Sequence, residues 1–500
     1  MAKAIMIQGT SSDVGKSVIC TALCRIFSND GYTVAPFKSQ NMALNSYITE
    51  DGGEIGRAQG VQAEAARVKA TTHMNPILLK PKGDMTSEII LHGKHHVNMD
   101  AKTYREQFVE EVMPEVTRSV RYLQEHFEIL VLEGAGSPAE INLKARDIAN
   151  MRMAHLADAA VLLVADIDRG GVFASIIGTL ALLDEDERAR VKGLVINKFR
   201  GMKELLDNGL EWVEKETGIP VLGVIPYMDV HIEAEDSLAL ASLRFKKPKA
   251  GEFALDVVMI RLPRISNFTD VDPFFEEPDV GVRIVSTVAE LGQPDLILLP
   301  GTKNTMDDLQ WLKDTGFAQQ LLKLREKGVR IIGICGGYQM LGTLLRDDQA
   351  IEGEQGCTVE GLSLLPIATT FTAQKKTVQV EGTIVATGET VTGYEIHLGR
   401  STIQEGATPL IQLADGHIDG ARTEDGRVFG TYLHGIFHNR HVTRRIVNEI
   451  RLEKGLAPLA NEVKSDAELR HLTYEQLAQH VRAHLDIKRI YDILQLNTSE

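Results

Sequence analysis

Residues 3–31 read KAIMIQGTSSDVGKSVICTALCRIFSNDG, and the order of patterns in this stretch decides the fold. A short apolar run, KAIMIQG, comes first, and a loop rich in glycine and serine follows it. The residues after the loop carry apolar side chains at helical spacing and end at Gly31. A strand, a loop of this composition and a helix are typical of the start of a parallel α/β domain.

The loop GTSSDVGKS has the composition of a site for phosphate groups. Backbone N–H groups of such a loop and of the helix that follows can cradle phosphate oxygens. Lys16 would add positive charge near the outer phosphates, and the Ser17 hydroxyl could ligate Mg²⁺. The alternative, a glycine–serine turn with a chance lysine, is disfavoured by the position of the loop between a strand and a helix. The predicted ATP-binding residues here are Gly9, Thr10, Asp13, Val14, Gly15, Lys16 and Ser17.

Further along residues 1–245, three continuous apolar runs end at polar residues or glycine: FEILVLEGAG, AAVLLVADI and VKGLVINKF. Runs of this kind fit strands that are covered on both faces, so we expect a doubly wound parallel sheet. Ligands bind at the carboxyl ends of such strands. Glu133 ends the first run and is a predicted Mg²⁺ ligand, because a hard cation prefers carboxylate oxygen. The alternative is a solvated acid at the end of a strand.

Polar side chains crowd the stretch PFKSQNMALNS (residues 36–46) and the stretch DGGEIGRAQ (residues 51–59). A lysine could steady phosphoryl charge there, and the amides could hold polar groups of a substrate. Asp51 or Glu54 is a candidate for a second Mg²⁺ ligand. A plain polar surface loop is the alternative. The predicted residues of this substrate loop are Lys38, Gln40, Asn41 and Asn45.

A second α/β pattern occupies residues 252–438, after a basic, proline-bearing linker at residues 243–252. Its predicted strands are ALDVVMIRL, VRIVST, PDLILLPG and GVRIIGIC, and residues 305–328 supply a crossing helix. Residues 439–500 are predicted to be a helical extension. We therefore expect three parts: residues 1–245, residues 252–438 and the C-terminal helices.

The sequence GICGG (residues 333–337) lies between an apolar strand and a helical segment. Glycines around one cysteine at such a turn describe a nucleophile elbow, in which the helix N-terminus favours the thiolate of Cys335. A buried structural cysteine is the alternative. His434, at the end of the run VFGTYLHGIF, is the best candidate for the base. His397 in GYEIHLGRS is a weaker candidate for that role.

Backbone N–H groups of LPGTKNT (residues 299–305) could form one half of an oxyanion hole, with the amide of Gly336 as the other half. His397 could line the pocket for the glutamine amide together with two neighbours on the same run. The predicted oxyanion and glutamine-binding residues are Gly301, Thr302, Gly336, Gln339, Tyr394, Glu395 and His397.

Bulk composition narrows the class of protein. The 500 residues exceed what one core usually organises, and the formal net charge of -15 opposes sequence-independent binding to nucleic acid. No apolar run approaches the roughly 20 residues of a membrane span, and the N-terminus is predicted to be a strand and not a signal peptide. None of the four cysteines has zinc-site spacing. We expect a cytoplasmic enzyme without a membrane partner; the oligomeric state is left open.

Two resemblances carry these expectations further. The long spacing between Gly9 and Gly15 resembles the loop of dethiobiotin synthetase, in whose relatives the residues that match Asn197 and Lys198 contact the base. The segments ICGGYQMLG, GYEIHLGRS and GTYLHGIF resemble the triad-type glutamine amidotransferase domain of the cobyrinic and cobyric acid synthase group. Ordinary triad enzymes carry Glu two residues after the histidine, where this chain has Ile436, and this group is understood to work with a Cys–His dyad.

The resemblance implies an ATP- and Mg²⁺-dependent ligase that takes ammonia from glutamine. It implies amidation of the b, d, e and g carboxylates of adenosylcobyrinic acid a,c-diamide, a corrinoid, to give adenosylcobyric acid in adenosylcobalamin synthesis. The nearest alternative is cobyrinic acid a,c-diamide synthase. Two others are a P-loop ATPase with an inactive glutaminase fold and a glutaminase whose N-terminal half senses nucleotide.

Overall fold

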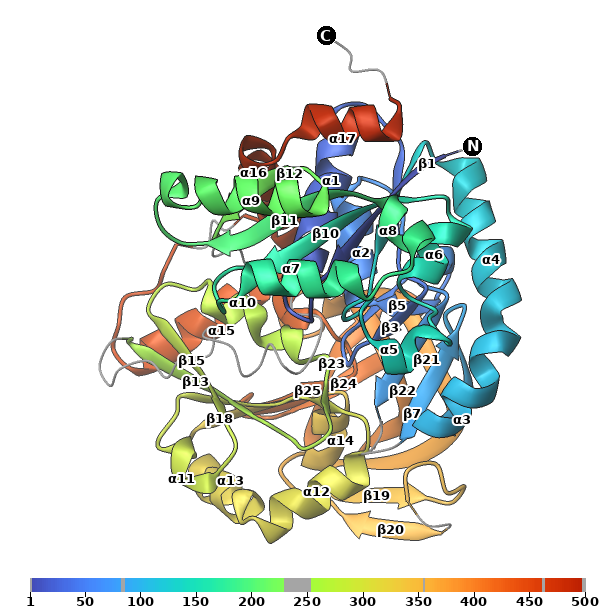
Figure 1. The fold of residues 1–500 in the computed structure, drawn as a ribbon. Coiled ribbons are helices and arrows are strands. Elements are labelled where there is room, and N and C mark those ends of the chain that lie inside the picture. The colour runs from blue at the N-terminus through green and yellow to red at the C-terminus, as the bar shows by residue number, and fades with distance from the viewer. Residues whose placement is uncertain (1, 82–85, 229–252, 354–355, 461–463, 497–500) are drawn as a thin grey trace. The chain divides into compact units, whose positions relative to one another are not determined.

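The computed structural model describes residues 2–81, 86–228, 253–353, 356–460 and 464–496. The chain divides into two compact units, each assembled from segments that are distant in sequence (Figure 1). Unit 1 comprises Met1–Ala43, Gly53–Glu233 and Leu469–Glu500. Unit 2 comprises Leu44–Gly52 and Ala234–Glu468.

Unit 1 is built on a six-stranded parallel sheet, as the continuous apolar runs predict. The register of the sheet places Ile7 level with Glu133, so Glu133 lies at the same edge as the loop that follows Gly9. In sheet order the strands are β12 (Val221–Pro226), β11 (Val191–Phe199), β10 (Ala160–Asp166), β1 (Lys3–Gly9), β9 (Ile129–Glu133) and β2 (Val34–Phe37).

A smaller sheet in the same unit follows the order β3–β6–β7–β8. Its strands are β3 (Gln40–Met42), β6 (Ile77–Pro81), β7 (Thr86–Leu91) and β8 (Lys94–Asp100); the short β5 spans Glu54–Gly56. The α-helices before the tail are α1 (Lys16–Asn29), α2 (Arg57–Ala65), α3 (Ala101–Thr103), α4 (Val109–His126), α5 (Ile141–Lys144), α6 (Met151–Leu156), α7 (Val172–Ala181), α8 (Glu185–Arg190) and α9 (Asp207–Thr217). A π-helical turn, η2 (Tyr104–Phe108), joins α3 to α4, and the 3-10 helices are η1 (Thr72–Met74) and η3 (Lys203–Leu205).

The C-terminal helices α16 (Asp466–His484) and α17 (Ile487–Leu494) bring the far end of the chain into unit 1. Tyr491 packs its ring 5.6 Å from that of Phe27 on α1. Leu477, Val481 and Ile490 are buried in the same apolar core as the first strand. The red α17 therefore lies by the blue α1 in Figure 1.

Unit 2 has a mixed sheet, in which β15 (Val280–Val285), β13 (Leu255–Ile260), β16 (Leu296–Leu299), β18 (Arg330–Ile334) and β25 (Val428–Thr431) are parallel neighbours. From β25 its path continues through β24 (Ile418–Thr423), β23 (Ala407–Leu413), β21 (Ile367–Ile384), β19 (Leu344–Asp347) and β20 (Cys357–Glu360). The strand β22 (Thr390–Ile403) pairs with β21 off this path. The short strands are β4 (Ser46–Ile48), β14 (Ile265–Ser266) and β17 (Gly301–Thr302).

The helices of unit 2 are α10 (Asp272–Phe275), α11 (Val288–Leu291), α12 (Thr305–Asp314), α13 (Phe317–Glu326), α14 (Gly336–Leu341) and α15 (Arg440–Glu453), with 3-10 turns η6 (Phe268–Val271) and η7 (Ile436–His438). The single crossing helix predicted at residues 305–328 is wrong. It is divided into α12 and α13 because Gly316 takes a left-handed conformation, with φ 83°, which stops an α-helix.

The compact units do not follow the predicted domain boundaries. The helical extension predicted at residues 439–500 is shared, since α15 belongs to unit 2 and α17 to unit 1. Residues 44–52, predicted as part of the N-terminal domain, belong to unit 2. The linker predicted at residues 243–252 lies outside the described residues.

Candidate active sites

The phosphate loop of unit 1 is held in shape by its own lysine and glycines. Lys16 Nζ donates to the carbonyl oxygen of Ser11 at 2.9 Å and to that of Gly136 at 3.0 Å. Gly15 precedes α1 with φ 101°, and a Cβ there would lie 2.2 Å from Nδ2 of Asn197. The loop therefore needs glycine at this position for conformation and for space.

Asn197 and Lys198 lie at the loop, as the resemblance implies, but they contact its backbone. Asn197 Nδ2 donates to the carbonyl oxygen of Val14 at 2.8 Å. Lys198 Nζ donates to the carbonyl oxygen of Asp13 at 2.5 Å and pairs with Asp166 at 2.9 Å. These side chains fix the loop from the neighbouring strand.

Glu133 is the centre of a buried polar cluster beside the loop. Its Oε1 accepts hydrogen bonds from Ser17 Oγ at 2.8 Å and from Lys38 Nζ at 2.9 Å, and its Oε2 accepts one from Gln62 Nε2 at 2.6 Å. Burial by itself would raise the pKa of Glu133, but the Lys38 ammonium and these hydrogen bonds hold that pKa below its ordinary value. The carboxylate is therefore charged and can bind a cation.

Burial lowers the pKa of Lys16, against the opposing effect of Glu133. Among the residues that the structure describes, no three His, Cys, Asp or Glu side chains form a group that could hold a metal ion. A hydroxyl beside one carboxylate still suits Mg²⁺, which keeps several water and phosphate oxygens as ligands. Ser17 and Glu133 form such a pair.

The residues of the predicted substrate loop are divided between the two compact units. Lys38, Gln40 and Asn41 belong to unit 1, whereas Asn45 and Asp51 belong to unit 2. The Asp51 carboxylate accepts a hydrogen bond from Thr49 Oγ1, and its role as a second Mg²⁺ ligand stays a prediction.

The other candidate for a second Mg²⁺ ligand, Glu54, forms a fully buried ion pair with Lys80. Its carboxylate is therefore occupied within unit 1. Asn41 donates to Gln59 Oε1 at 3.0 Å and is buried, so it supports the loop from inside.

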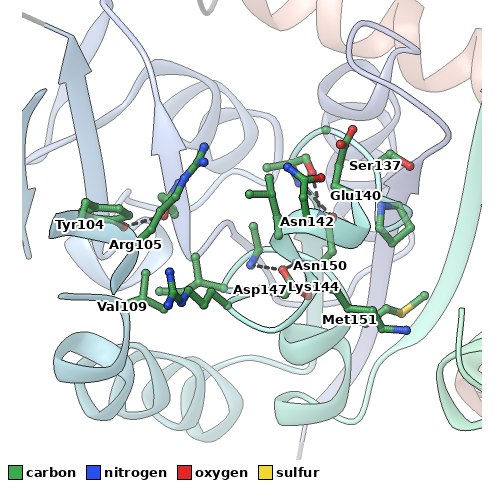
Figure 2. A pocket seen from close by; sticks show the side chains of 18 of the residues that line it. Tyr104, Arg105, Val109, Ser137, Glu140, Asn142, Lys144, Asp147, Asn150 and Met151 are labelled. Carbon is green, nitrogen blue, oxygen red and sulfur yellow. Dashed lines mark hydrogen bonds between the residues drawn. The ribbon is translucent and has the colours of Figure 1, made fainter. Parts of the chain in front are cut away.

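A pocket of about 640 Å³ opens next to the phosphate loop in unit 1 (Figure 2). Figure 2 shows Tyr104 and Arg105 of the π-helical turn on one side, and Glu140, Asn142 and Asp147 on the other. Its apolar lining residues are Ala101, Val109, Ala135, Pro138, Leu143, Ile148, Ala149 and Met151. Its charged ones are Lys102, Arg105, Glu106, Glu140, Lys144, Arg146, Asp147 and Glu187.

Several of these charged side chains form ion pairs or hydrogen bonds within the protein. Lys144 pairs with Asp184 at 2.9 Å and with Glu187 at 2.7 Å. Asp147 accepts three backbone N–H groups of the segment that follows it. Lys102, Arg105 and Arg146, by contrast, have no side-chain partner within the described ranges of the chain. The pocket reaches the phosphate loop at Gly136, whose carbonyl oxygen accepts a hydrogen bond from Lys16.

In unit 2, Cys335 has the conformation of a nucleophile elbow. Its φ of 53° and ψ of -110° lie in a region that non-glycine residues rarely adopt. A Cβ on Gly337 would lie 2.0 Å from the carbonyl oxygen of Leu299, so only glycine fits after the turn. Cys335 begins α14 and is 7% exposed, with Sγ 3.6 Å from the carbonyl oxygen of Ile396.

His434 reaches Cys335 from the adjacent strand. Ile334 on β18 is level with Thr431 on β25, so the residues that follow both strands meet at one sheet edge. Burial lowers the pKa of His434, but the Asp270 carboxylate and an interaction with the Cys335 side chain raise it to about 10. The sulfur is thus beside an imidazole, as the sequence predicts.

Tyr394 and Gly301 of the predicted glutamine site adjoin the histidine. The Tyr394 ring stacks on that of His434 at 5.1 Å, and the two backbones exchange hydrogen bonds at 2.9 and 3.1 Å. A Cβ on Gly301 would lie 3.1 Å from Cε1 of His434. A Cβ on Gly336 would lie 3.2 Å from the backbone nitrogen of Thr302, so these two predicted oxyanion donors are neighbours.

The remaining predicted residues are held by partners inside the fold. Gln339 donates to Tyr432 Oη at 3.1 Å and accepts from Thr305 Oγ1 at 2.9 Å. His397 stacks on the ring of Tyr432 at 3.7 Å, whereas the side chain of Cys335 interacts with His434. The buried Glu395 pairs with Lys376 and faces His397 at 3.7 Å.

Two residues near His434 escape prediction from local motifs: Asp270 and Asn267. Asp270 Oδ2 is 2.7 Å from His434 Nδ1, and Asn267 Nδ2 is 3.5 Å from Nε2. Asn267 Oδ1 also accepts the N–H of Ser46, in the segment from residues 44–52. Both lie in the connection from β13 to α10, where Asn267 precedes the turn η6 and Asp270 is within it. The available signal was the rule that ligand-binding residues lie beyond the carboxyl ends of parallel strands.

No described helix combines the length and apolar character needed to cross a membrane. The family model described as CobQ/CobB/MinD/ParA nucleotide binding domain matches residues 5–239. The model described as CobB/CobQ-like glutamine amidotransferase domain matches residues 256–442.

Curated relatives match nearly the whole chain. A cobyric acid synthase of Anoxybacillus flavithermus is 53% identical, over 97% of this chain and 96% of the relative. One of Geobacillus sp. is 52% identical over 98% of both chains, and one of Yersinia enterocolitica is 49% identical over 99% of both. With both domain models, the elbow cysteine and the phosphate loop in agreement, the chain belongs to the cobyric acid synthase family, whose members are glutamine-dependent amidotransferase ligases.

Proposed function

We propose that this chain uses ATP and glutamine to amidate the b, d, e and g carboxylates of adenosylcobyrinic acid a,c-diamide, giving adenosylcobyric acid for adenosylcobalamin synthesis. The observation that carries the proposal is that one chain contains two groups of interacting polar side chains, one in each unit. Unit 2 has the interacting pair Cys335 and His434, and unit 1 has the cluster of Lys16, Ser17 and Glu133.

In unit 2, the Cys335 sulfur would attack the side-chain carbonyl carbon of glutamine. An imidazolium at His434 stabilises the thiolate and supplies the proton that the departing ammonia takes. Backbone N–H groups of Thr302 and Gly336 are close enough together to face the developing oxyanion. Water then hydrolyses the thioester to glutamate, with His434 as the base.

In unit 1, an oxygen of the substrate carboxylate would attack the γ-phosphorus of ATP, forming an acyl phosphate and ADP. Lys16 and the loop N–H groups hold the phosphate oxygens. Mg²⁺ bound at Ser17 and Glu133 would neutralise phosphate charge. Ammonia then attacks the acyl carbon, and phosphate leaves to give the carboxamide.

We assign the pocket beside the phosphate loop as the binding site of the corrinoid. Its volume falls within the roughly 300–1,000 Å³ of small-molecule sites, so it can take one edge of the macrocycle. Apolar residues suit the ring, and Lys102, Arg105 and Arg146 can pair with its peripheral carboxylates. Glu106 and Glu140 also line the pocket and would disfavour a deeply seated acid. A binding site with few fixed contacts suits a substrate that must bind in four orientations, one for each carboxylate.

The same chemistry on two other carboxylates, by a cobyrinic acid a,c-diamide synthase, is the second candidate. Mass spectrometry of the corrinoid product separates the two, because it counts the carboxyl groups converted to amides. A P-loop ATPase with an inactive glutaminase fold would leave the strained Cys335 and its histidine partner without a purpose.

Two substitutions, one in each unit, test whether glutamine hydrolysis and ATP-dependent amidation occur at separate sites. Cys335→Ala should abolish amidation with glutamine and leave amidation with ammonium unchanged, because only the first needs the thiolate. Lys16→Ala should stop amidation from both nitrogen sources. Corrinoid products would be counted by mass spectrometry with each nitrogen source in turn. Loss of both activities in Cys335→Ala, or full turnover in Lys16→Ala, would contradict the proposal.

A further inference from the structure

The glutaminase site contains a carboxylate that the usual sequence position does not supply. Triad-type enzymes carry Glu two residues after the histidine, but this chain has the buried Ile436 there. Asp270 Oδ2 instead lies 2.7 Å from His434 Nδ1, and its Oδ1 accepts the N–H of Gly435 at 2.8 Å. One carboxylate thus contacts both the imidazole and the backbone that carries it.

We infer that Asp270 is the positioning residue of a Cys335–His434–Asp270 triad, whose acid comes from the 3-10 turn η6 and not from the histidine segment. The inference rests on the proposed function of Cys335 and His434. Asp270 is 6% exposed and His434 is fully buried, so water does not compete with this contact.

The contact fixes which nitrogen of His434 faces the sulfur. An acceptor at Nδ1 requires a proton on that nitrogen, which leaves Nε2 free to exchange a proton with Cys335. The carboxylate also stabilises the imidazolium that forms when the thiol loses its proton. The bond to Gly435 N–H adds a second anchor, because the ring and its own backbone are held by one group.

The other groups that surround His434 are consistent with Asp270 as its counter-charge. The titratable groups that face His434 are Asp270, Cys335 and Tyr394, and Tyr394 stacks on the ring from β22. Asn267, from the same loop as Asp270, lies 3.5 Å from Nε2 and cannot replace a carboxylate as the counter-charge. Within the described residues, Asp270 is the carboxylate that hydrogen-bonds this histidine.

The test is Asp270→Asn, which keeps the size of the side chain and removes its charge. The kcat for glutamine-dependent amidation should fall by about 10²- to 10⁴-fold, as when the acid of a serine-protease triad is replaced. The KM for glutamine should change little. The rate at which iodoacetamide alkylates Cys335 should lose its low-pH component, because the thiolate no longer has a stabilised imidazolium beside it. Asp270→Glu should restore part of the rate.

Asp347→Asn is the matched control. Asp347 is also a buried aspartate of unit 2, and its carboxylate accepts backbone N–H groups far along the chain from His434. This variant should keep the wild-type pH profile of alkylation. Ammonium-dependent amidation should persist in every variant, so its loss would point to the proposed function and not to Asp270.

A kcat within threefold of wild type in Asp270→Asn would overturn the inference. So would an alkylation profile that Asp270→Asn and Asp347→Asn change alike. Should Asp270→Asn fail to fold, Asp270→Ser, with a smaller side chain that keeps a hydrogen-bonding oxygen, takes its place in the same assay.

Discussion

The imidazole of His434 connects chemistry to stability at the scale of one residue. Asp270 raises the pKa of this buried group to about 10, above its ordinary value of 6.5. A raised pKa favours folding wherever the histidine is charged. Its contribution is complete below pH 6.5 and declines as the pH rises through about 10.

We therefore expect the stability difference between wild type and His434→Gln to shrink steadily from pH 6.5 to pH 10. Urea unfolding of unit 2, followed at several pH values, measures this difference. His417→Gln removes an exposed imidazole, 78% accessible, and is the control for the substitution itself. A wild-type advantage that grows with pH would contradict the assignment of charge.

Local motifs identify residues whose neighbours in sequence are also their neighbours in space. The strand, loop and helix around Lys16 and the glycines around Cys335 are short-range patterns, and the structure forms both. Asp270 is separated from His434 by more than half of unit 2, so no spacing rule indicates it. Asp51 is close in sequence to Lys38, yet the two residues fall in different compact units, which no spacing in the sequence indicates.

At the scale of elements, the π-helical turn η2 forms one wall of the pocket that we propose for the corrinoid. Turns of this kind are rare and occur frequently at functional sites. The turn presents Arg105 to the pocket, and Tyr104 behind it donates to Gln40 Oε1 at 2.5 Å. This bond ties the wall to the strand that follows Lys38.

Arg105→Ala should raise the KM for the corrinoid acid roughly 5- to 10-fold, because one charge-assisted contact to a carboxylate is lost. The KM for ATP and the hydrolysis of glutamine should not change. Arg121→Ala, an exposed arginine on α4 outside this pocket, is the control. An unchanged KM for the corrinoid in Arg105→Ala would remove the pocket assignment and leave the amidation chemistry intact.

Strands were predictable because buried parallel strands have continuous apolar sequences. The runs at residues 3–9, 160–166 and 191–199 correspond closely to β1, β10 and β11. The break between α12 and α13 at Gly316 was not predictable from the sequence. A glycine inside an amphipathic pattern is compatible with a continuous helix, and only tertiary packing decides whether the chain turns there.

At the scale of the whole molecule, the C-terminal helices are part of the core of unit 1. The buried residues Leu477, Val481 and Ile490 lie in one cluster with Ile5 and Ile7 of the first strand. The amphipathic spacing of the tail predicted helices, but it held no information on which unit they would join.

Ile490→Ala should destabilise unit 1 by about 2–5 kcal/mol, the usual cost of removing a large buried aliphatic side chain. Leu472→Ala, at a site 41% exposed on α16, should be nearly neutral. The half-life of ammonium-dependent amidation at elevated temperature should fall in Ile490→Ala alone. Alkylation of Cys335, which reports on unit 2, should keep its rate; a parallel loss would contradict the assignment of the tail to unit 1.

The nine residues from Leu44 to Gly52 leave unit 1, join unit 2 and return. Within unit 2 they hydrogen-bond the loop of Asp270: Asn45 Oδ1 accepts the N–H of Phe268 at 3.2 Å, and Asn267 accepts that of Ser46. A gene split between the two units would therefore produce a fragment of unit 2 that lacks these nine residues. Neither unit is a continuous length of polypeptide, so no single cut in the chain separates both units intact.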